Sequence, residues 1–253
     1  MIIDSHCHID FSDFDEDRQE VLDRATHLGV EKIIVPGVKQ STWLRISEYC
    51  QRYTQLYPCF GLHPYFINEH CENDLDSLQN IISQIKPVAV GECGLDFFLK
   101  DLDKSKQHFY FEQQLDIAIQ AQLPVVVHAR KSTQAVIQAI KQRPGLSGMI
   151  HSYSGSYEQA KQLIELGFYL SFGGPITYEK STRLRKLVQD LPLSHLLVET
   201  DAPDQPVANT DSSRNEPGFI IDVIDTISTL HQLDPSEIAS ITTENANRLF
   251  QLV

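Results

Sequence analysis

The residues PVVVHAR, at positions 124–130, contain the pattern on which the rest of the chain is built. Their three valines form a short apolar, β-branched run, which predicts a strand over residues 124–128. Runs of this kind recur along the whole chain, and each is followed by a polar segment with helical periodicity. The predicted strands are residues 2–5, 32–35, 58–61, 88–92, 124–128, 148–151, 168–172 and 196–199. Strands that alternate with helices in this way indicate an α/β fold with a parallel sheet.

The polar segments between the predicted strands carry helix signals. Two of them contain apolar residues at helical spacing, and two begin with capping patterns. The apolar stripes are Val21, Leu22, Ala25 and Leu28, closed by Gly29, and Leu184, Leu187, Val188 and Leu191. The capping patterns are SYEQ at residues 156–159 and DPSE at residues 234–237. These signals predict amphipathic helices of the kind that surround a barrel.

Length and composition favour a closed barrel. A chain of 253 residues has the usual size of one TIM-type (β/α)8 barrel and is long enough to bury a large core. No Gly/Ser-rich linker divides it, so we predict a single domain over residues 1–253. An open doubly wound sheet is the alternative that the pattern leaves open. No Gly-x-Gly-x-x-Gly fingerprint is present, which argues against a Rossmann dinucleotide site.

The charge balance is acidic. Lys and Arg number 21 against 34 acidic residues, for a formal net charge of −13. Proteins that bind long stretches of nucleic acid usually present a basic face, and the nearest basic run here is Arg183, Arg185 and Lys186. No run approaches the ~18 apolar residues of a membrane span, and the first residues do not resemble a secretory signal. We therefore expect a soluble, cytoplasmic protein without an obligate protein partner.

Histidines and carboxylates follow the predicted strands. His6 and His8 stand one residue apart where the first strand ends, and the period-2 geometry of a strand sends both side chains to the same face. Four further residues stand at or just past the ends of later strands, and in a barrel these ends meet at one mouth, where active sites lie. The sequence therefore predicts a site for one or two divalent cations. Its expected ligands are His6, His8, Glu92, His128, His151 and Asp201.

The ligand types leave the metal open. Nitrogen and oxygen ligands without thiolate suit Zn, Mn, Ni or Co, and with retained waters also Mg. The five cysteines are an odd number with no C-x-x-C pair, which argues against a disulfide framework and a zinc knuckle. We expect Cys7, between the two histidines, to point to the opposite face and to serve packing.

Other polar residues near the predicted strand ends have more than one interpretation. His63 could contact a substrate phosphate, protonate a leaving group or be a hydrogen-bonded wall residue. Arg130 could bind phosphate or pair with Asp96. Glu199 could pair with another residue of the mouth or orient a ligand. The segment NEP, residues 215–217, could be a helix cap followed by a first-turn proline.

With these residues identified, the sequence resembles the TatD-type metal-dependent hydrolases, a family within the amidohydrolase-like barrels. The resemblance spans the chain and is specific when its motifs are taken together. The motifs are DSHCH at 4–8, GLHP at 61–64, GECGLD at 91–96, PVVVHAR at 124–130, HSYSG at 151–155, ETDAP at 199–203 and NEP at 215–217. It implies that Glu92 bridges two ions, with His6, His8 and Asp201 on one and His128 and His151 on the other.

Two cations at such a site favour hydrolysis, because they activate water and stabilise both the attacked centre and the leaving oxygen. Asp201 is the expected general base, with Glu92 and His63 as further catalytic residues and His63 and Arg130 as substrate contacts. The resemblance implies a deoxyribonuclease that acts on nucleic-acid ends. A metal-dependent hydrolase of a small-molecule ester, lactone, amide or phosphoester is the alternative. A non-catalytic partner protein with a relic site is a third hypothesis, which the intact ligand set disfavours.

Overall fold

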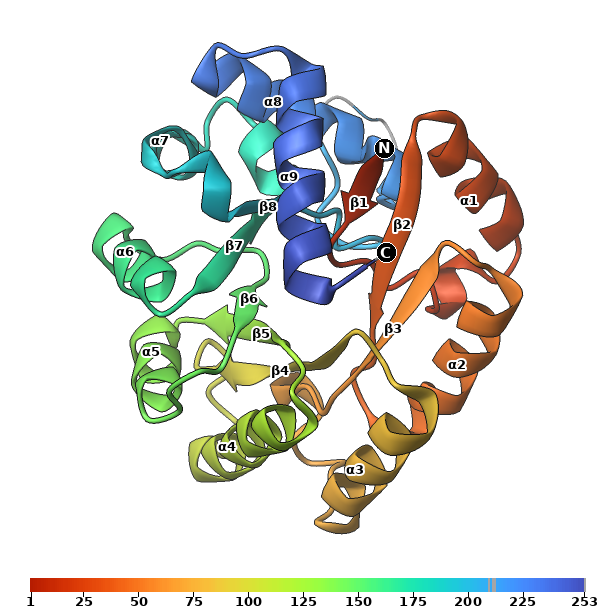
Figure 1. The fold of residues 1–253 in the computed structure, drawn as a ribbon, viewed down its shortest axis with the longest axis vertical. Coiled ribbons are helices and arrows are strands. Elements are labelled where there is room, and N and C mark those ends of the chain that lie inside the picture. The colour runs from red at the N-terminus through yellow and green to blue at the C-terminus, as the bar shows by residue number, and fades with distance from the viewer. Residues whose placement is uncertain (209, 211–212, 253) are drawn as a thin grey trace. The chain divides into compact units, whose positions relative to one another are not determined.

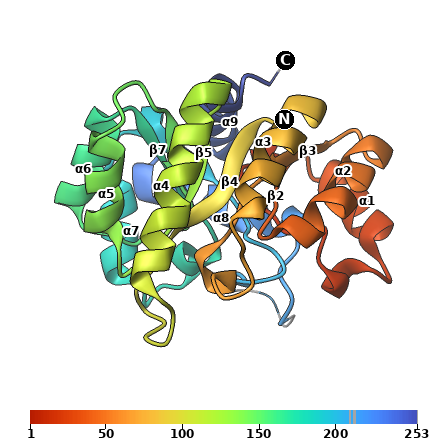
Figure 2. The same ribbon diagram turned by 90° about the horizontal axis from the view of Figure 1, so that it is seen from below.

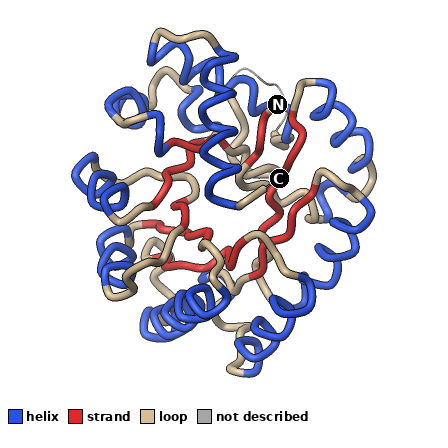
Figure 3. Tube along the Cα trace, viewed as in Figure 1, coloured by secondary structure: helices blue, strands red, loops and turns tan. Residues whose placement is uncertain are grey.

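The computed structural model describes residues 1–208, 210 and 213–252. Strands alternate with helices along the chain, as the colours of Figures 1 and 3 show. The strands belong to one eight-stranded sheet in the order β1 to β8. They are β1 (Ile2–Asp4), β2 (Val30–Pro36), β3 (Leu56–Phe60), β4 (Ala89–Asp96), β5 (Val125–Arg130), β6 (Gly148–Ile150), β7 (Phe168–Phe172) and β8 (Leu196–Val198).

Every strand pair whose register is described is parallel. The predicted strands are all present, with ends that differ by a few residues. The α-helices are α1 (Arg18–His27), α2 (Trp43–Arg52), α3 (Asn73–Ile85), α4 (Lys104–Ala121), α5 (Thr133–Lys141), α6 (Tyr157–Glu165), α7 (Thr182–Asp190), α8 (Ile220–His231) and α9 (Pro235–Phe250). No helix in the part of the chain that the structure describes is long and apolar enough to cross a membrane.

The chain divides into two compact units. Unit 1 consists of Met1–Val35, Ser152–Tyr157 and Leu170–Val253. Unit 2 consists of Pro36–His151 and Glu158–Tyr169. The single domain over residues 1–253 and the cytoplasmic location stay predictions.

In unit 1, the last helix, α9, packs against β1 and β8. Asn245 of α9 donates hydrogen bonds from Nδ2 to the carbonyls of Leu193 and Leu196, at 2.8 and 2.9 Å. The predicted cap of α9 is confirmed, because the Asp234 carboxylate accepts from the amide of Ser236 and a proline occupies the first turn. The apolar stripe predicted for α1 is wrong at one residue, because Leu28 lies past the end of the helix and is half exposed.

In unit 2, α4 packs against β4 and α5 against β4 and β5, as two views show (Figures 1 and 2). Strand β4 extends to Asp96, four residues beyond its predicted end. Its register against β5 shifts between Val90 and Cys93, and Gly91 and Gly94 have φ values of 147° and 146°. A Cβ on Gly94 would lie 2.0 Å from the carbonyl oxygen of His128, so only glycine fits there. Such irregularities are frequent beside active sites, where they redirect side chains.

Candidate metal centre

In unit 1, His6 and His8 follow β1 with their side chains directed to one another. The amide of Cys7 between them donates to the carbonyl of Ile34, and the amide of His8 donates to the carbonyl of Ala202, at 3.0 and 2.8 Å. Both imidazoles are buried, and their Nε2 atoms lie 3.3 Å apart. The predicted arrangement of the two histidines is therefore present. Cys7 is fully buried, as expected for a packing residue.

Asp201 completes a group of three ligand atoms in this unit. Its Oδ1 lies 3.5 Å from His6 Nε2 and 3.6 Å from His8 Nε2. A tetrahedral ion with bonds of about 2.0–2.2 Å separates its ligand atoms by about 3.3–3.6 Å. The spacing of the three atoms therefore fits a single divalent cation.

The loop after β8 holds Asp201 in place. The Asp201 amide donates to the carbonyl of His6 at 2.9 Å, and Gln205 Nε2 donates to Asp201 Oδ2. Asn215 is fully buried, and its Nδ2 donates to the carbonyls of Thr200 and Gln205 at 2.8 and 3.0 Å. Asn215 therefore braces this loop. It does not cap the short helix Pro217–Phe219, so that interpretation was wrong, whereas the first-turn proline is confirmed.

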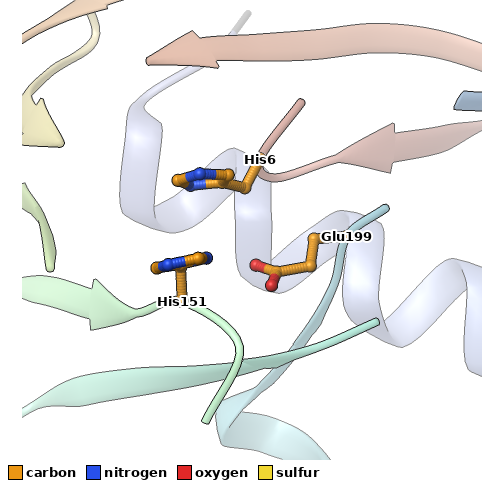
Figure 4. A group of neighbouring side chains, drawn as sticks. All are labelled: His6, His151 and Glu199. Carbon is orange, nitrogen blue, oxygen red and sulfur yellow. The ribbon is translucent and has the colours of Figure 1, made fainter. Parts of the chain in front are cut away.

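Two buried carboxyl groups support the same region of unit 1. Asp4 accepts hydrogen bonds from the Thr200 hydroxyl and amide, at 2.5 and 3.1 Å, and burial raises the pKa of Asp4 to about 8. The Glu199 carboxylate accepts from the Ser152 amide at 2.7 Å. Figure 4 shows that the side chains of His6 and Glu199 extend in the same direction from their backbones. The sequence did not predict the role of Asp4, because its contact with Thr200 joins residues 196 positions apart.

In unit 2, three imidazoles converge on one oxygen of Glu92. Glu92 Oε1 lies 3.0 Å from His63 Nε2, 3.3 Å from His128 Nδ1 and 3.1 Å from His151 Nε2. His128 Nδ1 and His151 Nε2 are 3.3 Å apart, a separation that also fits two ligands of one cation. His63, Glu92 and His128 form a group that could hold a metal ion. Glu92 is 2% exposed, so a bound cation would compensate its buried charge.

Asp96 orients His128. Its Oδ2 lies 3.1 Å from His128 Nε2, which leaves Nδ1 directed to Glu92. Burial raises the pKa of Asp96, but the hydrogen bond and charge of His128 and the amides of Phe98 and Leu99 outweigh it, so the net pKa is lowered. Gln107 fixes the Asp96 backbone by accepting from its amide and donating to its carbonyl. A carboxylate on the far nitrogen of a ligating histidine is a common feature of metal sites.

His63 and Arg130 lie in different environments. His63 Nδ1 accepts a hydrogen bond from the Tyr65 amide at 3.0 Å, so Nε2 carries the proton of the neutral ring and donates to Glu92. Burial lowers the pKa of His63, which favours this neutral form. Arg130 is exposed, with its guanidinium carbon 3.9 Å from the centre of the Phe98 ring. Among the described residues no ion pair joins Arg130 to Asp96, so that interpretation was wrong.

Replacing Asp96 with asparagine is expected to weaken metal binding by about 10- to 100-fold, because the amide no longer fixes the tautomer and orientation of His128. Titration of the metal-free protein with Zn²⁺ or Mn²⁺ measures the change. The exposed Asp76→Asn on α3 is the control, and its affinity should equal that of the unmodified protein. Equal affinities for all three proteins would show that Asp96 does not support the ligand.

Comparison with known proteins gives the family. The model of the family described as TatD related DNase matches residues 3–251. The chain is 35% identical to the uncharacterized metal-dependent hydrolase YabD of Bacillus subtilis (strain 168), over 100% of both chains. The crystal structure of YJJV, a TatD homolog from Escherichia coli K12, matches with a TM-score of 0.95 and 35% identity, over 100% of this chain and 98% of that one. A TatD family hydrolase of Entamoeba histolytica, at 23% identity, shares the fold with a TM-score of 0.88, over 98% of this chain and 97% of that one.

The sheet order and the match to the YJJV structure show a TIM-type barrel of eight parallel strands alternating with helices. The open doubly wound sheet is therefore wrong. The chain belongs to the TatD related DNase family and is a metal-dependent hydrolase.

Proposed function

We propose that the chain is a deoxyribonuclease that hydrolyses phosphodiester bonds at DNA ends with the aid of divalent cations. The observation that carries the proposal is the ligand spacing. In unit 1 the atoms of His6, His8 and Asp201 lie 3.3–3.6 Å apart, and in unit 2 those of Glu92, His128 and His151 lie 3.1–3.3 Å apart. Both sets fit a divalent ion. The family description supports a nuclease.

We assign the ligands to the two ions as the family resemblance implies. His6, His8, Glu92 and Asp201 bind one ion, and Glu92, His128 and His151 bind the other. Divalent ions at such a site lower the pKa of water and neutralise charge on the attacked phosphate. The donors are nitrogen and oxygen atoms, which suits Zn, Mn, Ni, Co or hydrated Mg. Cys7 is not assigned to the set, because its Sγ lies 3.8 Å from the carbonyl oxygen of Ala202, and none of the groups among the described residues that could hold a metal ion includes it.

The side chains around the ligands have separate tasks in this proposal. Asp201 accepts a proton from the attacking water, as a carboxylate beside the metal ligands can do. Gln205 holds its Oδ2, and its Oδ1 faces the Nε2 atoms of His6 and His8. His63 Nε2 is a donor that can protonate the leaving oxygen or bind the phosphate. Arg130 binds a neighbouring phosphate, because its guanidinium is exposed and held over Phe98.

An activity panel tests the proposal. Protein stripped of metal by a chelator is reconstituted with each of Mg²⁺, Mn²⁺, Co²⁺, Ni²⁺ and Zn²⁺, then incubated with end-labelled DNA, RNA, lactones, carboxylic esters and phosphomonoesters. We expect shortening of DNA from an end, and only with metal. Hydrolysis of a lactone or ester without DNA cleavage would replace the nuclease with the small-molecule hydrolase, which the net charge of −13 favours. Activity that survives exhaustive chelation would refute the metal requirement.

The acidic balance predicts that few phosphates are bound. With two or three contacts, a plot of log affinity for single-stranded DNA against log salt should have a slope of about −1.4 to −2.1, since each neutralised phosphate contributes about −0.7. Arg130→Ala should reduce the slope by about one contact and raise KM. Arg52→Ala, at the end of α2, is the control and should leave the slope unchanged. A much steeper slope would require an extended basic track.

A further inference from the structure

Two aromatic side chains of unit 2 are exposed beside residues that contact Glu92 and His128. Tyr65 is 58% exposed and stands two residues after His63. Phe98 is 51% exposed and stands two residues after Asp96. Among the exposed large hydrophobic side chains of the described residues, Tyr65 and Phe98 are the two that stand within two residues of a member of this buried polar cluster, where each ring offers an apolar face beside polar groups. Their position suggests contact with a ligand.

Backbone hydrogen bonds hold the two segments that carry these rings next to the cluster. The Tyr65 amide donates to His63 Nδ1 at 3.0 Å, and the Phe98 amide donates to Asp96 Oδ1 at 2.9 Å. In each case the bond spans two residues, which closes a tight turn and fixes the backbone from which the ring extends. His63 and Asp96 in turn contact Glu92 and His128. The two rings are therefore attached to the same side-chain network from two loops.

A cation accompanies one of the rings. Arg130 ends β5 opposite Asp96 in the register of β4 and β5, and its guanidinium covers one face of the Phe98 ring at 3.9 Å. Within the described part of the chain, Arg130 makes no ion pair, so its N–H groups can bind an anion. The exposed Lys131 comes next in the sequence. An exposed ring beside a cation fits a ligand that has both a flat apolar group and a negative charge.

We propose that Tyr65 and Phe98 are stacking sites for unpaired nucleobases next to the cleaved phosphate, with Arg130 on a neighbouring phosphate. The inference rests on the proposed nuclease function and specifies how that site holds its substrate. Bases in a duplex have their faces covered by neighbouring pairs, so only unpaired bases can stack on these rings. Stacking is tolerant of sequence and needs few charges, which suits a protein with a net charge of −13.

The test compares two substrates that differ only in their bases. The metal-loaded protein is given an end-labelled oligothymidylate or an abasic oligonucleotide of equal length. The measured ratio is kcat/KM for the oligothymidylate divided by kcat/KM for the abasic oligonucleotide. Base stacking on an aromatic side chain corresponds to a preference of about 5- to 150-fold per base. We expect Phe98→Ala and Tyr65→Ala each to reduce the ratio by a factor in this range. Phe98→Tyr should retain the ratio, and Phe98→Leu should lose it.

Ile119→Ala is the control, because Ile119 is 41% exposed but lies in the last turn of α4, about 20 Å along the helix from its start. Its ratio should equal that of the unmodified protein. If Phe98→Ala and Tyr65→Ala leave the ratio unchanged while the protein cleaves DNA, the stacking sites are refuted and the nuclease function stands. If the unmodified protein cleaves neither oligonucleotide but hydrolyses a small ester, both proposals fail.

Discussion

Replacing Glu92 with glutamine is expected to lower kcat roughly 10³-fold while the fold is retained. Three imidazole nitrogens lie within 3.0–3.3 Å of Glu92 Oε1, so this carboxylate is the centre of the unit 2 cluster. Glutamine has nearly the same shape but no charge, and it cannot hold the two cations that we propose Glu92 bridges. A loss of several kcal/mol of electrostatic stabilisation corresponds to a rate change of this size.

The measurement of kcat at saturating metal is accompanied by metal analysis and thermal unfolding. The Tm should change little, because glutamine fills the same buried space. Glu20→Gln, on the exposed face of α1, is the matched control and should retain full activity. A Glu92→Gln protein that folds, loads metal normally and turns over at near the original rate would show that Glu92 is not the bridge.

The strands could be predicted because each is an apolar run of ordinary length between polar segments. The true length of β4 could not be predicted. Gly91 and Gly94 interrupt the apolar pattern of this strand, and their role depends on how closely β5 approaches: a Cβ on Gly91 would lie 2.5 Å from the carbonyl oxygen of Val126. The spacing of residues in the sequence does not indicate how closely two strands approach one another. A glycine in a strand indicates only that a bulge or close contact is present.

The residues of the site likewise divide into those that the local sequence predicts and those that only the tertiary structure shows. The pairing of His6 and His8 could be predicted, because residues two positions apart in an extended segment place their side chains on the same face. The contact between Asp96 and His128 joins residues 32 positions apart, and it depends on the shifted register of β4. The hydrogen bond from Gln205 to Asp201 depends on a loop in which both residues have positive φ. Local patterns therefore identify the candidate ligands, whereas the residues that orient them follow from the tertiary structure.

Replacing Asp201 with asparagine is expected to lower kcat by about 10²- to 10⁴-fold with a much smaller change in KM, because a general base contributes about this much. Asp201 Oδ2 accepts from Gln205 Nε2, and Oδ1 faces the Nε2 atoms of His6 and His8. An asparagine that keeps the bond from Gln205 must place its NH₂ group toward the histidines, where it can neither accept a proton nor bind a cation.

The matched control is Gln205→Ala, which removes the hydrogen bond to Oδ2 but leaves the carboxylate. Its kcat should fall much less than that of Asp201→Asn. Turnover of both variants is measured at a metal concentration where elemental analysis shows the same occupancy as in the unmodified protein. If Asp201→Asn regains full turnover once occupancy is restored, Asp201 is a ligand only. If turnover of Asp201→Asn stays low at full occupancy while Gln205→Ala stays active, the Asp201 carboxylate itself takes the proton.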